Sequence, residues 1–519
     1  MATDVAAPKE VKPLQAYNRH IISEHLKDRS PYLEEITSHL KEDEISMAMG
    51  DRLFPRLVEQ LTAPGRAPEK LVEALRTICD MCSHQENKSI AINSEVISAA
   101  THLLMHENIP VRRDAARVIS SMSLLIGGRG LLPIGSSNLS DKLTKAVGSG
   151  PTLPRLAKLL LSCDDELVKL HVAEAMQSIT IFRDGCQQVV DQGTVVGITQ
   201  YLCATLPDLP ATKSLALCLL NLLQTLAAVT MYANNGMRDI LGTGLIAKVV
   251  GFLGNDPSGA LPNVLPKHST HATDIVRQAL RLLWHCGNNM KARVEILQAE
   301  GVRVITQFLS DTDSKVREAA ICALNVVSLE TQGKKDIYAH SLTEIARIIH
   351  EENETTYLQE TAVQLCRSAS ELPVFRFAFA RHVLKSVWLL EKVYGTAALA
   401  AISPLLFPKE DMETRTQACV VAHHFLTSSN ISFNGDDIRV PPVCPLPHVE
   451  HPPSFSFEEC VDILHNLIDL TEQVEQSKEC LKALAGMPKP KNELANLLRA
   501  GLIVPPESQK AFVESLVQD

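Results

Sequence analysis

The chain contains few clusters of residues that could perform chemistry, and cysteine and histidine supply most of them. Cys79 and Cys82 have the CxxC spacing of redox and zinc sites, and on a helix their thiols would lie on roughly one face. The sequence around them contains neither a second CxxC nor a pair of histidines. We therefore interpret both cysteines as small apolar residues of a helical core in a reducing compartment.

Histidine also occurs at spacings that suit a metal. His102 and His106 are four residues apart and would share a helix face, but no glutamate follows the first in an HExxH arrangement. A second group lies near a proline-rich stretch and matches no zinc motif: Cys444, His448, His451 and Cys460. We predict no metal site and keep zinc at this second group as the open alternative.

Enzyme motifs are not recognisable. The glycine-rich run 127–130 lacks the Lys-Ser/Thr of a P-loop and follows no predicted strand, so we expect an insertion between repeats there. We find no GxSxG, no kinase motif set and no convincing Ser/His/Asp pattern. We expect a non-enzyme without catalytic residues and without a cofactor.

The elements that would position these residues repeat along the chain. Residues 316–328 align without a gap on residues 358–370, an offset of 42 residues. Val316, Ala320 and Leu324 recur at helical spacing, and small alanines allow neighbouring helices to approach closely. A wholly helical repeat near this length is the signature of armadillo and HEAT solenoids.

One repeat position can be followed through the chain, with Asn325 as its reference. The eight windows are 40 to 63 residues apart, which predicts an all-α, right-handed superhelical solenoid of about eight repeats. Three long steps contain insertions, at 127–150, 254–271 and 373–413, the last with an extra helix over 378–394. The marker residues are Asp80, Ser120, Gln177, Asn221, Trp284, Asn325, Arg367 and His423.

These eight markers are the candidate partner-binding residues. In armadillo repeats the third helix lines a concave groove, so the markers would form a ladder along it. Seven of the eight are polar with apolar neighbours, which favours a groove that holds an extended peptide by its backbone. The alternative is that they are only the solvent-facing edge of each helix.

Composition supports a helical protein and excludes some partners. Apolar residues make up 45% and aromatic residues 4%, which suits closely packed helices. The net charge of −10 gives no reason to expect nucleic acid. The most apolar stretch, 215–229, is interrupted by Asn221 and Gln224, so we expect a buried helix and no membrane span. The first five residues lack the apolar core of a secretory signal, so we expect a cytoplasmic location.

The pattern divides the chain into four parts. We expect a polar tail with capping helices over 1–48, the repeats over 49–428, a proline-rich loop over 429–456, and C-terminal helices and a tail over 457–519. The C-terminal helices are predicted over 457–470, 473–485 and 492–500. Pro488 and Pro490 are expected to end the second of these.

Residues 50–428 resemble the armadillo family, through Gly-x-Ile/Val, a helix, and then Val-Arg-x-x-Ala-Ala-x-x-Ala-Leu-x-x-Val-Ser. Importin-α is similar in outline only, because its Trp-x-x-x-Asn spacing occurs once here, at Trp284 and Asn288. A closer resemblance is to the radial spoke head 14 family of armadillo proteins, carried by residues 51–61, 75–81, 92–93, 111–113 and 127–129. This resemblance implies a structural protein of the ciliary or flagellar axoneme.

Three functions therefore compete. The first is a cytoskeletal scaffold of the axoneme that binds radial-spoke subunits. The second is a soluble adaptor that binds peptide segments of cargo or signalling partners. The third is an enzyme or a regulator of a GTPase or a chaperone, for which no motif is found. The fold alone does not decide among the three, since one fold can have many functions.

Overall fold

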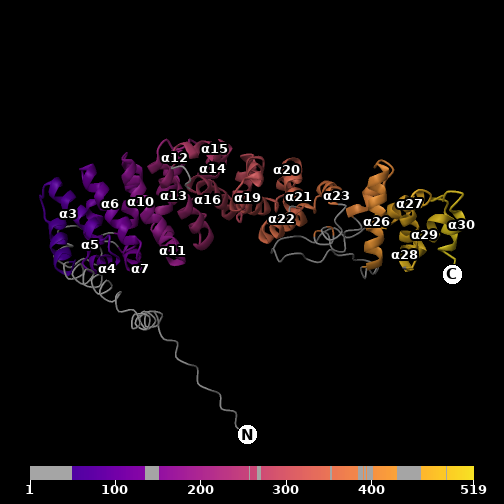
Figure 1. The fold of residues 1–519 in the computed structure, drawn as a ribbon, viewed down its shortest axis with the longest axis horizontal. Coiled ribbons are helices and arrows are strands. Elements are labelled where there is room, and N and C mark those ends of the chain that lie inside the picture. The colour runs from indigo at the N-terminus through magenta and orange to yellow at the C-terminus, as the bar shows by residue number, and fades with distance from the viewer. Residues whose placement is uncertain are drawn as a thin grey trace, which may run out of the picture. The chain divides into compact units, whose positions relative to one another are not determined.

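The computed structural model describes residues 50–518 apart from 135–150, 256, 266–269, 351–353, 384–389, 391–392, 394–400, 429–456 and 487. Within these residues the regular elements are α-helices and short 3-10 helices, without a β-strand (Figure 1). The all-α prediction is confirmed for this part of the chain. The predicted tail and capping helices over 1–48 and the proline-rich loop over 429–456 lie outside the described residues.

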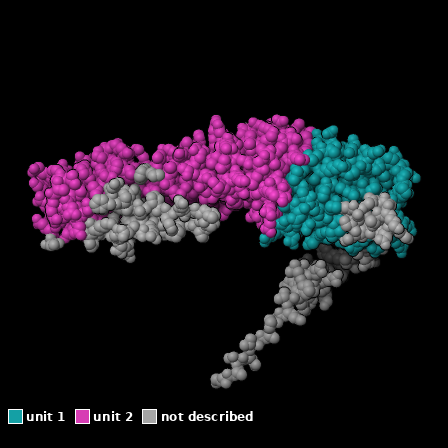
Figure 2. All heavy atoms as spheres, turned by 180° about the vertical axis from the view of Figure 1, so that it is seen from behind, with its two compact units in different colours: residues 1–197 teal, residues 198–519 magenta. Residues whose placement is uncertain are grey.

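The chain forms two compact units, residues 1–197 and 198–519, which Figure 2 colours separately. The boundary falls inside α12 (Thr194–Thr205). After a helix over residues 50–62, the first unit contains α3 (Pro68–Met81), α4 (Gln85–Asn93), α5 (Val96–Leu103), α6 (Ile109–Ser123), α7 (Ile126–Leu131), α9 (Thr152–Ser162), α10 (Glu166–Ile179) and α11 (Arg183–Asp191).

The second unit holds the remaining helices. They are α13 (Lys213–Tyr232), α14 (Leu245–Gly254), α15 (Pro257–Ala260), η2 (Leu261–Asn263), α16 (His271–Cys286), α17 (Met290–Gln298), α18 (Gly301–Thr306), η3 (Gln307–Ser310), α19 (Ser314–Val327), α20 (Thr331–His340), α21 (Leu342–His350), α22 (Thr356–Ala369), α23 (Pro373–His382), η5 (Ser403–Leu406), α26 (Met412–Ser428), α27 (Phe457–Asp469), α28 (Glu475–Ala485), α29 (Pro488–Arg499) and α30 (Lys510–Ser515).

Three helices form one repeat. In the second unit, α17 and α18 precede α19, and α20 and α21 precede α22. The long helices α13, α16, α19 and α22 pack on one another in chain order, as α3, α6 and α10 do in the first unit (Figure 1). A repeat of three helices is the armadillo arrangement. The count of eight repeats and the right-handed superhelix stay predictions.

The long helix α19 shows why the sequence folds in this way. The Asp313 side chain caps its first turn by accepting a hydrogen bond from the Lys315 backbone N–H at 2.7 Å. Val316, Ala320 and Leu324 are fully buried, as their spacing predicts. The same kind of side-chain cap begins α6, α10, α13 and α22, through Asn108, Asp165, Thr212 and Thr355.

Four markers share a hydrogen bond at the end of their helix. Ser123, Thr180 and Ser328 each lie three residues after a marker, and each donates its hydroxyl to that marker's carbonyl oxygen. Ser83 does the same for Asp80, at 2.7 Å. The register of the eight markers stays a prediction.

The turn that follows a long helix is tight enough to require glycine at three places. A Cβ atom on Gly128, Gly185 or Gly333 would overlap a backbone carbonyl oxygen at the end of the preceding helix. These oxygens belong to Met122, Ile179 and Val327. Each glycine lies eight residues after its marker, so the turn repeats with the helices.

The structure corrects three predictions about connecting segments. Residues 127–130 lie in α7 and the turn at its start, not in an insertion. The extra helix expected over 378–394 begins earlier, as α23 at Pro373, and most of its predicted second half lies outside the described residues. Pro488 and Pro490 begin α29 instead of ending α28, because the first turn of a helix needs no backbone donor.

Helix α13 is long and apolar enough to cross a membrane by length and composition alone. It instead behaves as a core helix of the second unit: Leu219, Leu222 and Leu226 are buried, and α13 packs against α16. The buried helix predicted over 215–229 is therefore confirmed.

Two glycines of α7 provide a matched test of the tight turn. We expect Gly128→Ala to lower the free energy of unfolding of the first unit by about 2 kcal/mol, because the new methyl group overlaps the Met122 carbonyl. Gly130→Ala should be neutral or stabilising by up to ~1 kcal/mol, since no heavy atom lies within 4 Å of its Cβ position. Chemical denaturation followed by circular dichroism checks both, and equal effects would contradict the role of the turn.

Candidate functional site

The two cysteines of the CxxC sequence are core residues. Cys79 lies in α3 and is half-buried, and Cys82 at its C-cap is 1% exposed. Burial raises the pKa of Cys79 to about 11 and that of Cys82 to about 12. Both thiols therefore stay protonated at neutral pH, as expected of buried cysteines in a core.

The structure also separates the histidines. Helix α5 ends at Leu103, so His106 does not share a helix face with His102, and the prediction of a common face is wrong. His106 instead accepts a hydrogen bond at Nδ1 from the Asn108 backbone N–H at 3.0 Å. Among the described residues no group of three His, Cys, Asp or Glu is placed to hold a metal. Cys444, His448, His451 and the side chain of Cys460 lie outside the described residues.

Each marker residue lies on a long helix of its unit. Asp80 is exposed, Ser120 is buried, and the other six are half-buried. Their role in binding a partner stays a prediction. The first unit holds Asp80, Ser120 and Gln177 on α3, α6 and α10, and the second holds Asn221, Trp284, Asn325, Arg367 and His423 on α13, α16, α19, α22 and α26.

Ser120 is engaged within the protein. Its hydroxyl donates to Glu174 Oε2 at 2.8 Å, and His171 Nδ1 lies 2.9 Å from the same oxygen. Burial of Glu174 opposes its ionisation, but the hydrogen bonds from His171 and Ser120 outweigh this and lower its pKa. This polar cluster joins α6 to α10, so Ser120 holds two repeats together.

Three other markers are amides that remain available. The side chains of Gln177, Asn221 and Asn325 are half-buried and make no hydrogen bond with any described residue. An amide offers both donors and an acceptor, which is what an extended peptide backbone requires. In the second unit, the amides of Asn221 on α13 and Asn325 on α19 can bind a backbone without reading its sequence.

A hollow of about 380 Å³ lies on the face of α16, α19 and α22 in the second unit. Its lining residues range from the marker Trp284 itself to positions ten residues before the markers Asn325 and Arg367, which is almost three helical turns toward the N-terminal ends. The residues that line it are Arg277, Arg281, Trp284, Lys315, Glu318, Ala319, Cys322 and Tyr357. Sequence reasoning named only Trp284 among them. The spacing of Arg277 and Arg281 from Trp284, seven and three residues, is the signal that could have found two more.

Contacts within the protein fix the uncharged residues that line the hollow. Cys322 is 4% exposed, and its sulfur lies 3.6 Å from the Tyr357 hydroxyl oxygen. The Trp284 ring stacks on His285, with 4.7 Å between ring centroids. His285 Nε2 is buried without a hydrogen-bond partner among the described residues. Burial, and then the charge of Arg281, lowers the pKa of His285 from 6.5 to about 4, so its ring is neutral at pH 7.

The first unit carries a hollow of opposite charge at the same kind of position. This hollow, of about 580 Å³, lies between α3 and α6. Glu69, Glu73 and Asp80 line it, and Arg76 beside them pairs with Asp114 at 3.1 Å. The long-helix face therefore does not have a uniform charge.

A third hollow, of about 790 Å³, lies away from this face, among α17, α18 and α20. Its charged residues are largely paired inside the protein. Glu300 binds Arg303 at 3.3 Å, and Glu330 binds Arg293 at 2.8 Å.

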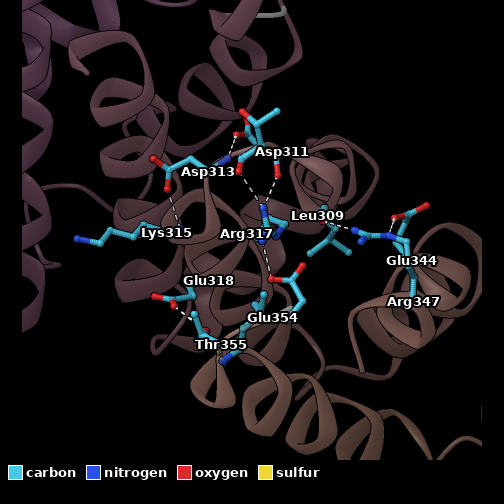
Figure 3. A network of polar contacts seen from close by, with 12 residues as sticks. Leu309, Asp311, Asp313, Lys315, Arg317, Glu318, Glu344, Arg347, Glu354 and Thr355 are labelled. Carbon is cyan, nitrogen blue, oxygen red and sulfur yellow. Dashed lines mark hydrogen bonds and ion pairs between the residues drawn. The ribbon is translucent and has the colours of Figure 1, made fainter. Parts of the chain in front are cut away.

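Ion pairs fix the helices that carry the hollow (Figure 3). Arg317 of α19 donates to the backbone oxygens of Asp311 and Thr312 and to Glu354 Oε2 at 2.5 Å. The Arg317 and Glu354 side chains are 14% and 3% exposed, so this contact is a buried joint between repeats. Arg347 connects α21 to the Leu309 carbonyl oxygen at 2.9 Å in the same way.

The depressed pKa of His285 predicts how stability depends on pH. Below pH 6.5 the unfolded chain takes up a proton that the folded chain binds only near pH 4, so stability falls across this window as the pH falls. Each pH unit corresponds to about 1.4 kcal/mol, so we expect His285 to account for a loss of roughly 1 kcal/mol between pH 6.5 and 5.5.

Urea denaturation at the two pH values checks this prediction. His285→Gln should reduce the loss by about the same amount, and His340→Gln, at an exposed position of α20, should leave it as in the wild type. An identical pH dependence in the His285 variant would contradict the prediction.

Comparisons with known proteins show similarity to designed helical repeats. No protein-family model and no curated protein matches the chain. An engineered protein from a structural genomics consortium aligns over 90% of this chain and 97% of its own, with 17% identity and a TM-score of 0.48. A designed armadillo repeat protein covers 53% of this chain and 99% of its own, with 18% identity and a TM-score of 0.39. Another, solved in complex with the peptide (KR)4, covers 53% and 99%, with 18% identity and a TM-score of 0.37.

Proposed function

We propose that this chain is a non-catalytic scaffold that binds an extended segment of a partner protein on the face of α13, α16, α19 and α22. The observation that carries the proposal is the pair of half-buried amides of Asn221 and Asn325, which make no hydrogen bond within the described residues of the protein. They lie on α13 and α19 of the same stack, and α16, α19 and α22 of that stack line a hollow. Rigid stacked helices that present open polar groups suit the binding of an extended segment.

The geometry explains how such a face would hold a backbone. Long helices stacked in order repeat the same side-chain position at regular intervals. An extended peptide also repeats its donors and acceptors regularly, so the amides of Asn221 on α13 and Asn325 on α19 can bond to two separate peptide units of one segment. The buried joints of Arg317 and Glu354 keep this spacing fixed and reduce the entropy lost on binding.

Replacing Asn221, Asn325 and Arg367 together with alanine tests the proposal. The probe is a set of 12-residue peptides selected from a random phage-displayed library on the full chain and measured by fluorescence anisotropy. We expect a loss of affinity of about 10- to 100-fold, from removal of one or two partly buried hydrogen bonds. The helical circular dichroism signal should stay unchanged.

The matched control is Gln298→Ala, at an exposed position of α17 on the third hollow. It should bind the selected peptides as the wild type does. Unchanged binding by the triple variant would place the binding surface elsewhere on the molecule.

We also propose, on the resemblance to the radial spoke head 14 family alone, that the partner is an axonemal subunit. A tagged copy in a flagellated cell should then remain in the detergent-insoluble axoneme and be released only by high salt or a chaotrope. A diffuse, detergent-soluble pool in the cell body would reject the axonemal role and favour the soluble adaptor.

A further inference from the structure

The hollow beside Trp284 presents more positive than negative charge to a ligand. We propose that it binds an anionic group of the partner segment, a carboxylate or a phosphate, with an apolar or aromatic residue next to it. This inference rests on the proposed function, and it names the chemistry that the binding face selects.

Three cations from two neighbouring helices line the hollow. Arg277 and Arg281 come from α16, and Lys315 comes from α19. Asp274 neutralises Arg277, with 2.7 Å between carboxylate and guanidinium. The charged groups of Arg281 and Lys315 make no hydrogen bond or ion pair with any described residue. These two charges are therefore open to a ligand.

Negative charge among the lining residues is limited to Glu318. Its carboxylate accepts a hydrogen bond from the Thr355 hydroxyl at 3.0 Å, which directs it toward α22. Cys322 and Tyr357 add no charge at neutral pH, because burial raises the pKa of Cys322 to about 11 and that of Tyr357 to about 12. The hollow is thus locally positive in a chain whose net charge is −10.

The aromatic residues determine which kind of ligand side chain can bind next to the anion. Trp284 is half-buried and held by its stacking on His285, and Tyr357 is 52% exposed. Their rings provide apolar surface next to the two open cations, and this surface costs little conformational entropy to use. A lone anion would use only the cations. An acidic residue beside an aliphatic or aromatic residue would use both.

The competing interpretation is that Arg281 and Lys315 are ordinary solvated surface cations. Such residues contribute almost nothing to the selection of a ligand, because water and salt screen them. The two interpretations predict different affinities. If Arg281 and Lys315 bind the anion, changing an acid of the peptide to an amide weakens binding only when these two cations are present. If they are ordinary surface cations, the effect of that change does not depend on them.

The test is a double-mutant cycle on the full chain with the phage-selected 12-residue peptides. Each synthetic peptide is compared with a copy in which its acids are changed to amides. We expect the wild type to bind the acidic form about 10-fold more tightly at low salt. The Arg281→Gln, Lys315→Gln double variant should bind the two forms within about 2-fold of each other. Lys291→Gln, at an exposed position of α17, should behave as the wild type.

Charge reversal gives a second and stronger readout. Arg281→Glu should reverse the preference, so that a copy of the peptide with lysine in place of the acid becomes the tighter ligand. A copy with phosphoserine in place of the acid distinguishes the two sources of charge: tighter binding assigns the site to phosphate, and weaker binding assigns it to carboxylate.

Two failures are distinguishable. Selected peptides that depend on Asn325 but carry no acid, or that bind the double variant unchanged, would overturn the anionic preference and leave the proposed function standing. A library that yields no binding peptide at all would overturn both proposals.

Discussion

The close approach of the backbone at the ends of α6, α10 and α19 is the constraint that shapes three of the repeats. At Gly128, Gly185 and Gly333 the chain passes so near the preceding helix that no Cβ atom fits. Because the turn has one allowed geometry there, the next short helix starts at a fixed position and angle. The corresponding positions after α3, α16 and α22 are Lys88, Ala292 and Phe375, so those turns do not require glycine.

Side chains just after these glycines complete the turn by reaching back to the helix end. Arg129 donates to the Ser123 carbonyl oxygen at 2.8 Å, and Cys186 donates to the Thr180 carbonyl oxygen at 3.3 Å. At the equivalent place, Lys334 pairs with Glu371 and so bridges two repeats. The last carbonyls of a helix lack backbone donors, so these contacts stabilise groups that would otherwise be unsatisfied. Different residue types perform this task, which explains why the turn was less visible in the sequence than the helices.

The helices and their register were predictable because local signals agree with the packing. Val316, Ala320 and Leu324 recur at helical spacing, and burial requires that spacing. The hollow was not predictable in the same way. Arg281 and Lys315 lie 34 residues apart, and only the stacking of α16 on α19 brings them to one surface. The prediction that Pro488 ends a helix was wrong for a local reason. Proline is equally compatible with the end of one helix and with the first turn of the next.

Arg281 and Lys315 differ from the cations at the joints between repeats. Cations at the joints are paired within the protein, as Arg317 is with Glu354, Arg113 with Asp165 and Arg293 with Glu330. Such pairs are buried or half-buried, and breaking one leaves a charge without compensation. Arg281 and Lys315, which have no such partner among the described residues, contribute nothing comparable to the stability of the stack. Their removal should therefore change what the face binds and leave the free energy of unfolding nearly unchanged.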